Sequence, residues 1–546
     1  MTKKKVIIIG GGVGGLTAAT KLAQNDFDVT VYEKNNYCGG RCSRIYKDAF
    51  TFEQGAILYL FDDIYKRNFK ELGEDLEKRV KFIDNKDHHQ VFFEDGKFNY
   101  SKDIECLARE IELIEPCGDA KEKLQNFCAE SKAIEKFVTE NIFYQTYDNV
   151  WQMLWFWIMN FFNGIYPALF TNFYANLFND FIPNVWTGLM TNLKILWAAR
   201  SYTMHNSVNK YFKTDKVCQA LTFQSLYFGI SPYTGSSLFS ILVAYEIASG
   251  LRYPEMGMAS IVTALENIAE ENGVKIIKNQ SVRKILINRS ARAIGVKLAD
   301  KTIVLSDIVI SNADLTYTYN KLLPPTKYAV ELSKKDHVPS TITFFWGMDS
   351  KIEGLKSHNI FIPSDYKKLF EDIHDKKTIP DDPSFFIHIA NRMDPGMGPK
   401  DCMGRPKDMD ALTVIVPIGE MAGVQGGFDD KVEMVKKKVI KKLEDKLGIK
   451  DFASKIVTNI KTETPDTWQD KYNSWGGSIL GISHCLQNLA CFRPNQKCAE
   501  FDNLYFVGAS TQPGAGVPLV MCSALSLVPK IVADHSAQKT PAIDCQ

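Results

Sequence analysis

The feature that most constrains this chain is a glycine-rich turn that directly follows a strongly apolar strand. Residues 6–9 form a continuous β-branched run, as expected of a parallel strand buried on both faces. The glycine turn at 10–15 follows, then a helical pattern at 16–25 and a second strand at 29–33. Strand, turn, helix and strand together predict one βαβ unit of the Rossmann type.

Gly10, Gly12 and Gly15 match the pattern G-x-G-x-x-G. The first glycine makes the tight turn, the second lets a pyrophosphate approach the backbone, and the third lets helix and strand pack closely. The phosphate would lie on the amides at the helix N-terminus. Glu33 ends the second strand, where a carboxylate accepts hydrogen bonds from ribose hydroxyls. A structural turn without a ligand is the alternative, but the presence of all three glycines together with Glu33 argues against it.

A second glycine pair favours FAD over NAD as the dinucleotide. Gly39 and Gly40 follow Glu33 closely and suit a second backbone approach to the same ligand. Arg41 comes next, and its guanidinium can offer a forked donor to a pyrophosphate. A solvent-exposed arginine is the alternative interpretation of Arg41.

The C-terminal part of the chain contains a second strand–turn–helix pattern. Residues 504–509 predict a strand that runs into glycine, and 511–518 predict a turn that leads into a helix from about Leu519. A second helix N-terminus can place amides beside the flavin ring and stabilise its reduced anion. A plain loop is the alternative, but the two chain ends together predict one closed flavin site.

Length and composition exclude several other classes of protein. A chain of 546 residues predicts two or three packed domains. The net charge of +1 gives no reason to expect nucleic acid as a partner. The twelve cysteines lack zinc-finger spacing and are expected to be free thiols in a reducing compartment. The nine histidines show no triad or ligand spacing, so we expect neither a metal site nor nucleophilic catalysis.

Residues 151–178 are the most aromatic stretch of the chain. A spanning helix needs about 20 predominantly apolar residues, and Pro167 interrupts this run. The stretch could therefore be a span, a buried or substrate-tunnel segment, or a face that dips into a membrane. We expect an aromatic tunnel built partly from it, and a peripheral or monotopic association with the cytoplasmic side of a membrane.

Periodicity predicts further elements along the chain. Helices are expected at 259–273 and 429–447, and strands at 341–347 and 411–418. A group of short strands is expected at 274–277, 282–287, 293–298 and 302–304.

Several segments resemble the bacterial and fungal phytoene desaturases, the FAD-dependent carotenoid desaturases, with the fungal members closest. The resemblance covers both chain ends and most of 223–420, and it is faint across 62–222. The segments that carry it are VIIIGGGVGGLTAATKLAQNDFDVTVYEKNNYCGGRCSR, FEQGAILYL, FGISPYTGSSLFSILVAYEIASGLRYPEMG, IVISNADLTYTYNKLLP, STITFFWGMDSKIEGLKSHNIFI, WGGSILGISH and NLYFVGASTQPGAGVP.

The resemblance implies an α/β fold with a Rossmann-type FAD-binding domain, as in amine-oxidase-like flavoproteins, an interleaved α+β substrate domain and a helical, membrane-facing part. We expect the FAD-binding domain to comprise 1–61, about 250–325 and 463–546. The helical substrate region would span about 62–249, and the substrate domain about 326–462.

The resemblance also implies which residues contact FAD. Val282 would pair its backbone with the adenine, and three residues near the C-terminus would line the flavin ring. The full set is Gly10, Gly12, Gly15, Glu33, Gly40, Arg41, Val282, Gly508, Val517 and Pro518.

The implied activity is desaturation of phytoene or a related long apolar polyene that enters from a membrane. The flavin would take a hydride at N5, and a quinone or oxygen would reoxidise it. Glu246 and Tyr253 are candidates to take the proton, with a helix-face carboxylate and a core tyrosine as the structural alternatives. His484 and Asp314 are weaker candidates of the same kind.

Three departures from the family pattern bear on the substrate. Gln512 stands where the family motif has a histidine, Met256 replaces a glycine, and the apolar anchor found at the end of many fungal relatives is not seen. A polyene oxygenase, a retinol-saturase-like reductase and an amine oxidase are competing interpretations. So is a non-enzymatic protein that binds prenyl lipids, like the prenyl-protein escort proteins of this fold.

Overall fold

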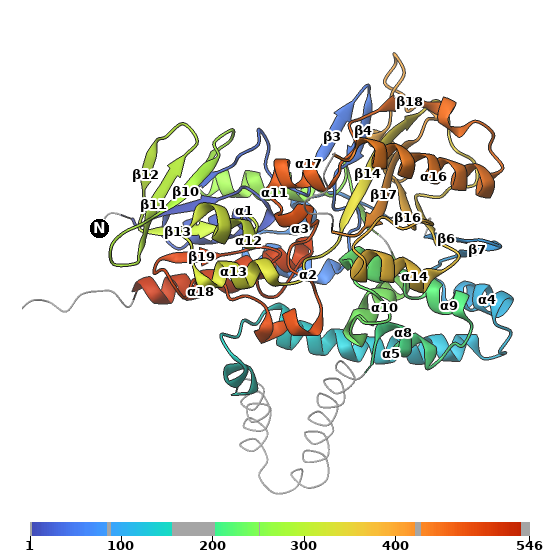
Figure 1. The fold of residues 1–546 in the computed structure, drawn as a ribbon, viewed down its shortest axis with the longest axis horizontal. Helices are drawn as coiled ribbons and strands as arrows, with labels where there is room; N and C mark the ends of the chain where they lie inside the picture. The colour runs from blue at the N-terminus through green and yellow to red at the C-terminus, as the bar shows by residue number, and fades with distance from the viewer. Residues whose placement is uncertain (1–2, 85–88, 156–201, 251, 421–426, 537–546) are drawn as a thin grey trace, which may run out of the picture.

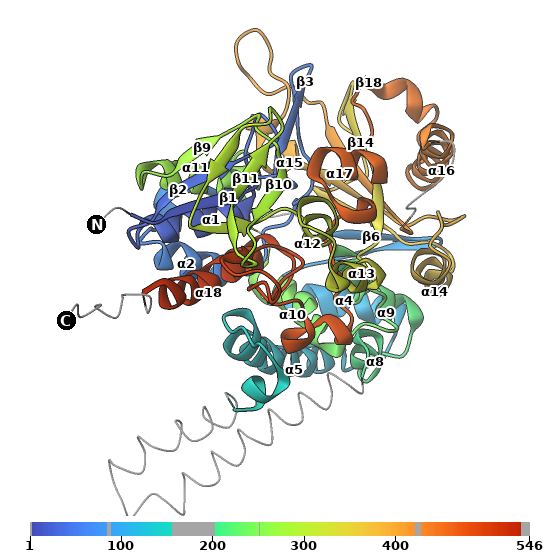
Figure 2. The same cartoon turned by 60° about the vertical axis from the view of Figure 1, so that its left-hand side comes forward.

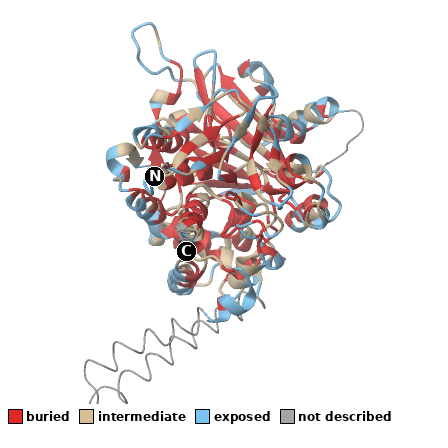
Figure 3. Cartoon of the chain, turned by 90° about the vertical axis from the view of Figure 1, so that its left-hand side faces the viewer, coloured by how far each residue is buried: buried red, intermediate tan, exposed pale blue. Residues whose placement is uncertain are grey.

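A computed structural model describes residues 3–84, 89–155, 202–250, 252–420 and 427–536. Two β-sheets organise these residues, and in Figure 1 they lie side by side with a layer of helices beneath the second one. Buried residues fill the interior around both sheets, whereas exposed residues concentrate on outer helices and loops (Figure 3).

The first sheet is parallel and has five strands in the order β19-β13-β1-β2-β9. Its central strand β1 (Lys5–Ile9) is buried on both faces, because Val6 and Ile8 pack in one core cluster while Ile7 and Ile9 pack in another. This is why the run is β-branched throughout. The predicted βαβ unit is confirmed. The other strands are β2 (Asp28–Tyr32), β9 (Lys275–Ile277), β13 (Ile308–Ser311) and β19 (Leu504–Phe506).

Two helices cover the first sheet close to the glycine turn. Helix α1 (Val13–Ala23) starts from the turn, and α18 (Val517–Ser536) packs beside it in the same core cluster. By length and composition, the stretch Val517–His535 could cross a membrane, but half of it is buried inside the protein. In the described part of the chain, α18 therefore serves as a core helix.

An antiparallel three-stranded sheet flanks the first one. It consists of β10 (Val282–Ile287), β11 (Ala293–Leu298) and β12 (Ile303–Leu305), close to the predicted ranges. Helix α11 (Ala259–Glu271) precedes it, as the amphipathic pattern predicted.

The second large sheet has seven strands in the order β18-β14-β17-β16-β15-β6-β7, and only the β15–β6 pair is parallel. Its members β6 and β7 come from the stretch that was expected to be helical, because four-residue strands carry too little periodicity to be recognised. Helix α16 (Asp429–Leu447) packs on this sheet and matches its predicted range. The strands are β6 (Gln90–Phe93), β7 (Gly96–Asn99), β14 (Ser340–Met348), β15 (His358–Phe361), β16 (Phe385–Ile389), β17 (Ala411–Ile418) and β18 (Ile456–Asn459).

A helical layer lies beneath the seven-stranded sheet in both Figure 1 and Figure 2. Its helices share one hydrophobic core with β6 and β15. They are α4 (Ile104–Ile114), α5 (Ala120–Val138), α8 (Met204–Asn209), α9 (Asp215–Ala220) and α10 (Ser240–Ser249).

The remaining elements connect these layers. The hairpin of β3 and β4 lies against the seven-stranded sheet, and the β5–β8 pair joins two distant parts of the chain. They are β3 (Arg44–Lys47), β4 (Phe50–Glu53), β5 (Phe82–Asp84), β8 (Arg252–Pro254), α2 (Asp62–Glu71), α3 (Leu76–Arg79), α12 (Leu315–Tyr317), α13 (Lys327–Lys334), α14 (Tyr366–Phe370), α15 (Ala390–Met393) and α17 (Pro465–Tyr472).

Candidate functional site

The glycine turn between β1 and α1 has the geometry that its sequence predicted. Gly10 has a φ of +95°, which L side chains rarely adopt, and its N–H donates to the Tyr32 carbonyl at 2.8 Å. A Cβ at Gly15 would overlap the carbonyl oxygen of Gly10. The third glycine therefore permits the close packing of helix on strand.

Asn312 supports the turn from below, and the sequence patterns did not single it out. Its Nδ2 donates to the Gly10 carbonyl at 3.2 Å. A Cβ at Gly12 would lie only 2.7 Å from that nitrogen. Asn312 directly follows β13, the strand that pairs with β1. A polar residue at the carboxyl end of a strand next to β1 was the one available signal.

The N-terminus of α1 is open to an anion. Its N-cap residue is Gly12, no side chain caps it, and the first turn holds no acidic residue. The first amides of a helix have no intrahelical acceptor, and the helix dipole favours negative charge there. This end of α1 has the properties of a phosphate-binding site.

Glu33 lies beside the turn and is buried. Its Oε2 accepts from the Gly11 N–H at 2.8 Å, and its Oε1 accepts from the Asn35 N–H at 2.7 Å. Burial raises the pKa of Glu33, while these two amide hydrogen bonds lower it. The two amides hold the carboxylate in a defined orientation at the end of β2.

The second glycine pair lies directly against the first turn. The Gly39 N–H donates to the Gly11 carbonyl at 2.8 Å. A Cβ at Gly40 would meet no protein atom within 4 Å, so this backbone faces open space. Arg41 follows, and its Nη1 donates to the Ile479 carbonyl at 2.6 Å. Burial lowers the pKa of Arg41, an effect that nearby Asp314 opposes.

One cavity of about 430 Å³ joins these pieces. Its wall contains every residue predicted to contact FAD except Gly15, which packs inside the turn instead. Glu33 and Val282 lie at one part of the wall, and the start of α18 forms another. That helix begins at Val517, two residues before the predicted start. The predicted residues in the wall are Gly10, Gly12, Glu33, Gly40, Arg41, Val282, Gly508, Val517 and Pro518.

The same cavity extends into an apolar chamber. Its walls come from the loop after β4, from the 3-10 helix η3 (Phe223–Phe228) and from the seven-stranded sheet. The apolar side chains there are Ile57, Leu58, Leu60, Phe61, Phe223, Leu226, Phe228, Ile360, Phe386 and Ile415.

The tunnel prediction for residues 151–178 receives no support from the described part of that stretch. Trp151 and Trp155 are 80% and 64% exposed, and no residue of 151–155 lines the cavity. Residues 156–178 lie outside the described residues. The chamber wall comes instead from η3 and the sheet, which the sequence patterns did not indicate.

Gln512 stands where the family motif has a histidine, and it does not face the cavity. Its Oε1 accepts from the Tyr147 N–H at 2.7 Å, and its Nε2 donates to the Tyr147 carbonyl at 2.8 Å. The amide thus clamps the backbone at Tyr147 to the loop before α18. A histidine could not supply this donor and acceptor pair in the same way.

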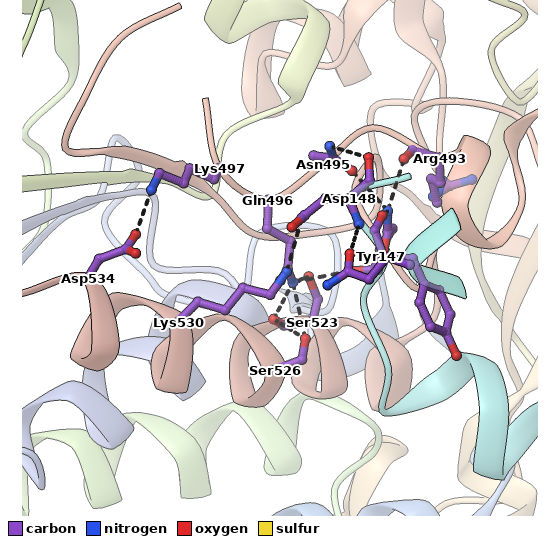
Figure 4. Close-up of polar contacts among 12 residues, drawn as sticks. Tyr147, Asp148, Arg493, Asn495, Gln496, Lys497, Ser523, Ser526, Lys530 and Asp534 are labelled. Atoms are coloured by element: carbon purple, nitrogen blue, oxygen red, sulfur yellow. Dashed lines mark hydrogen bonds and ion pairs between the residues drawn. The ribbon is translucent and has the colours of Figure 1, made fainter. Parts of the chain in front are cut away.

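A buried polar cluster holds this loop in place (Figure 4). The Arg493 guanidinium donates to the Thr511 carbonyl at 3.0 Å and to the Ala509 carbonyl at 2.5 Å. Burial lowers the pKa of Arg493 to about 9. Gln496 donates to the Ser523 carbonyl at 2.6 Å, which fastens the segment before β19 to α18.

Met256 replaces a glycine of the family pattern and adopts a backbone conformation typical of glycine. Its φ is +63°, in the left-handed region that glycine favours, and its N–H donates to Asp394 Oδ2 at 2.6 Å. Met256 does not line the cavity. The Asp394 hydrogen bond stabilises a conformation that otherwise costs about 1 to 2 kcal/mol for a residue with a side chain.

The two candidates for the proton acceptor lie behind the cavity wall. Glu246 is 2% exposed and accepts from Gln224 Nε2 at 2.8 Å. The Tyr253 hydroxyl donates to Glu53 Oε2 at 2.7 Å. Neither residue lines the cavity. Each would have to act through another residue.

The weaker candidates differ from each other in position. Asp314 lines the cavity and caps α12 by accepting from the Tyr317 N–H at 2.9 Å. His484 is not in the wall, and its Nε2 accepts from the Ala515 N–H at 3.1 Å. His484 therefore supports the loop before α18.

Two family descriptions match this chain. An NAD(P)-binding Rossmann-like domain matches residues 8–72, and the flavin-containing amine oxidoreductases match residues 198–526. The second match covers more than half of the chain.

Curated relatives extend over nearly the whole length. A phytoene desaturase of Fusarium fujikuroi is 33% identical over 97% of this chain and 90% of its own length. That of Phycomyces blakesleeanus is 34% identical over 98% of this chain and 86% of its own. A zeta-carotene-forming phytoene desaturase of Myxococcus xanthus is 30% identical over 98% and 95%.

Solved structures share the fold at low identity. A putrescine oxidase variant has a TM-score of 0.59 at 13% identity and covers 98% of this chain and 99% of its own. An oxidoreductase of Methanosarcina mazei has a TM-score of 0.58 at 16% identity, with 96% and 100% covered. A Rab GDI of Plasmodium falciparum has a TM-score of 0.51 at 12% identity, with 98% and 99% covered. The expected Rossmann-type flavoprotein architecture is confirmed.

Proposed function

This chain belongs to the phytoene desaturases, within the flavin-containing amine oxidoreductases, and we propose that it is an FAD-dependent desaturase that introduces double bonds into phytoene or a related polyene. One observation carries the proposal: a single cavity joins the dinucleotide-binding turn to an apolar chamber. A long hydrocarbon in that chamber would lie against the bound cofactor. The relatives support the polyene as its substrate class.

The residues in the wall fit FAD. The uncapped start of α1 and the open space at Gly40 suit a pyrophosphate, and Glu33 suits a ribose. The start of α18 would lie at the flavin ring. When bound, FAD supplies a hydride acceptor for a C–H bond.

The protein's own contribution would be positioning. The chamber is lined mainly by aliphatic and aromatic side chains, which would exclude water and hold an extended chain in one place. Holding reactants in a productive geometry can contribute about 7 to 11 kcal/mol to lowering a barrier.

We infer further that the protein takes its substrate from a membrane surface and passes electrons to a quinone or to oxygen. A long polyene partitions into lipid, and Trp151 and Trp155 are exposed. Tryptophan favours the membrane interface. Vesicle flotation of the purified protein, compared with a Trp151→Ala/Trp155→Ala variant, tests the membrane part.

Expression in phytoene-accumulating bacteria, with pigment spectra as the readout, tests the main proposal. Wild type should convert phytoene to more conjugated products, and Glu33→Ala should lose most bound flavin and most conversion. Unchanged phytoene with flavin demonstrably bound would reject the carotenoid assignment. Colourless purified wild-type protein would favour the alternative of a non-enzymatic lipid-binding protein.

A further inference from the structure

Three of the nine histidines form a row across the seven-stranded sheet. His89 immediately precedes β6, His358 begins β15, and His388 lies in β16. His358 pairs with His388 across the strands, and β6 lies on the other side of β15. The rings of His89 and His358 stack at 5.0 Å between centroids, as do those of His358 and His388. All three side chains are buried.

One end of the row is held by a carboxylate. His388 Nε2 lies 2.7 Å from Glu53 Oε2, the oxygen that also accepts from the Tyr253 hydroxyl. The Nδ1 atoms of His358 and His388 lie 3.4 Å apart. These contacts orient the stacked rings, and through them the ring of His89.

The other end of the row reaches the cavity. Tyr227 of η3 lines the chamber, and its hydroxyl lies 2.9 Å from His89 Nε2. Glu246 lies behind the same tyrosine, near enough that the hydroxyl of Tyr227 lowers the pKa of the carboxyl. Glu246 Oε1 is buried and has no hydrogen-bond partner in the described part of the chain. The carboxyl can therefore change its protonation state without breaking a hydrogen bond at this oxygen.

The surroundings of Glu246 set its proton affinity. Burial is the largest influence and raises the pKa of this carboxyl to about 8, while Gln224 and Tyr227 lower it. The other titratable groups that face the cluster are Tyr100, which accepts from Gln224 Nε2 at 3.1 Å, and Cys128 of α5 beside Tyr100. No lysine or arginine is among these groups, so no fixed positive charge holds the carboxyl ionised.

A purely structural role explains this cluster poorly. Burying a polar group without a full set of hydrogen bonds costs about 1 to 3 kcal/mol in proteins, and apolar side chains would fill the same space at no such cost. The described part of the chain also holds no group of three or more His, Cys, Asp or Glu side chains arranged to bind a metal ion. Proton transfer is the remaining chemistry that these side chains share.

We propose that Tyr227 is the residue through which the substrate proton leaves the chamber, with His89 and Glu246 behind it as the proton-holding pair. This inference rests on the proposed desaturation. Each new double bond breaks two C–H bonds: one leaves as a hydride to the flavin, and the electron pair of the other forms the double bond. The second hydrogen leaves as a proton and binds the phenol oxygen of Tyr227, while the hydroxyl proton of Tyr227 passes to His89 Nε2. The carboxylate of Glu246 balances the resulting imidazolium.

Tyr227 is the catalytic residue of this proposal because it lines the chamber. His89 and Glu246 act through it, and His358 and His388 position the ring of His89. The cluster accepts a proton only when Glu246 is ionised. The rate of flavin reduction by substrate should therefore rise with pH through a midpoint near 8.

The test uses the flavin-loaded protein with phytoene in detergent micelles, without oxygen, and follows flavin reduction in a single turnover across pH. Tyr227→Phe removes the hydroxyl and keeps the ring, and Glu246→Gln keeps the shape and removes the charge. Each should slow reduction about 100-fold, the usual scale of general acid–base catalysis, and lose the midpoint near pH 8. Tyr366→Phe is the matched control, because Tyr366 is a buried tyrosine that does not line the cavity, and this variant should react like wild type.

An infrared titration gives a second readout that is independent of turnover. The carbonyl band of a protonated buried carboxyl should disappear near pH 8 in wild type, be absent in Glu246→Gln, and titrate at higher pH in Tyr227→Phe. A wild-type protein that binds flavin but is not reduced by phytoene would reject the proposed function, and this inference with it. Equal rates and equal pH midpoints in wild type and Tyr227→Phe would reject the inference alone. A Glu246 band that Tyr227→Phe leaves unmoved would also overturn it.

Discussion

Two matched glycine substitutions distinguish an effect on FAD binding from an effect of backbone strain alone. Gly40 and Gly73 both have positive φ, +56° and +79°, and a Cβ at either would meet no protein atom within 4 Å. Only Gly40 lines the cavity. Alanine at either position should lower the free energy of unfolding of the apoprotein by about 1 to 2 kcal/mol, the cost of a left-handed conformation for an L-residue.

The two variants should differ once FAD is added. At Gly40 the new methyl group would occupy space that we assign to the pyrophosphate, and such overlap costs about 1 to 3 kcal/mol. FAD affinity should therefore fall by about 5-fold to 150-fold in Gly40→Ala, since each factor of ten is about 1.4 kcal/mol, and stay unchanged in Gly73→Ala.

Urea unfolding of the apoproteins and titration of flavin fluorescence provide the two measurements. The comparison is informative because the backbone cost is the same in both variants. Equal FAD affinity in Gly40→Ala and Gly73→Ala would show that the cofactor does not approach the backbone at Gly40, and would refute our placement of the pyrophosphate.

Three further substitutions test other parts of the structure. Arg493→Lys should lower the free energy of unfolding by about 3 kcal/mol, because a lysine cannot donate to all the backbone carbonyls that the guanidinium contacts. A decrease of less than about 1 kcal/mol, measured by urea unfolding, would contradict a stabilising role for the guanidinium. Gln512→Ala should lower the free energy of unfolding by about 1 to 3 kcal/mol, because the backbone of Tyr147 loses two hydrogen bonds, and should leave the pH dependence of flavin reduction as in wild type. A changed pH profile would show that Gln512 takes part in the reaction. The pKa of Glu246 is raised from 4.5 to about 8, so between these pH values the folded state holds a proton that the unfolded state lacks, and the free energy of unfolding falls as pH rises. Glu246→Gln should remove up to about 1.4 kcal/mol per pH unit of this decrease. An unchanged dependence of the free energy of unfolding on pH would mean that the carboxyl is not buried as described.

The dinucleotide site could be predicted from the sequence because its signals are local. Gly10, Gly12 and Gly15 lie within a few residues of one another, and Glu33 ends the next strand. The positions in the turn require glycine for their backbone conformation or close packing, and the ribose site requires a carboxylate, so few other residue types could stand there. Local periodicity also predicted α16, because apolar residues recur at helical spacing along its whole length.

The chamber and the support of the site could not be predicted in this way. Asn312 contacts Gly10 only because β13 pairs with β1. Gln512, which stands where the family motif has a histidine, holds the backbone of Tyr147 through a contact between distant segments. Nothing in the spacing of these residues signals their proximity.

The glycine turn, its acid and the cofactor that they imply were determined by the sequence alone, since turn geometry and helix termini depend on neighbouring residues. The row of His89, His358 and His388 was decided only by the tertiary structure. Three short strands bring these rings together through their pairing register, and register depends on which strands meet across a sheet rather than on any local pattern. The same pairing places the row behind Tyr227, where we infer that it serves the chemistry.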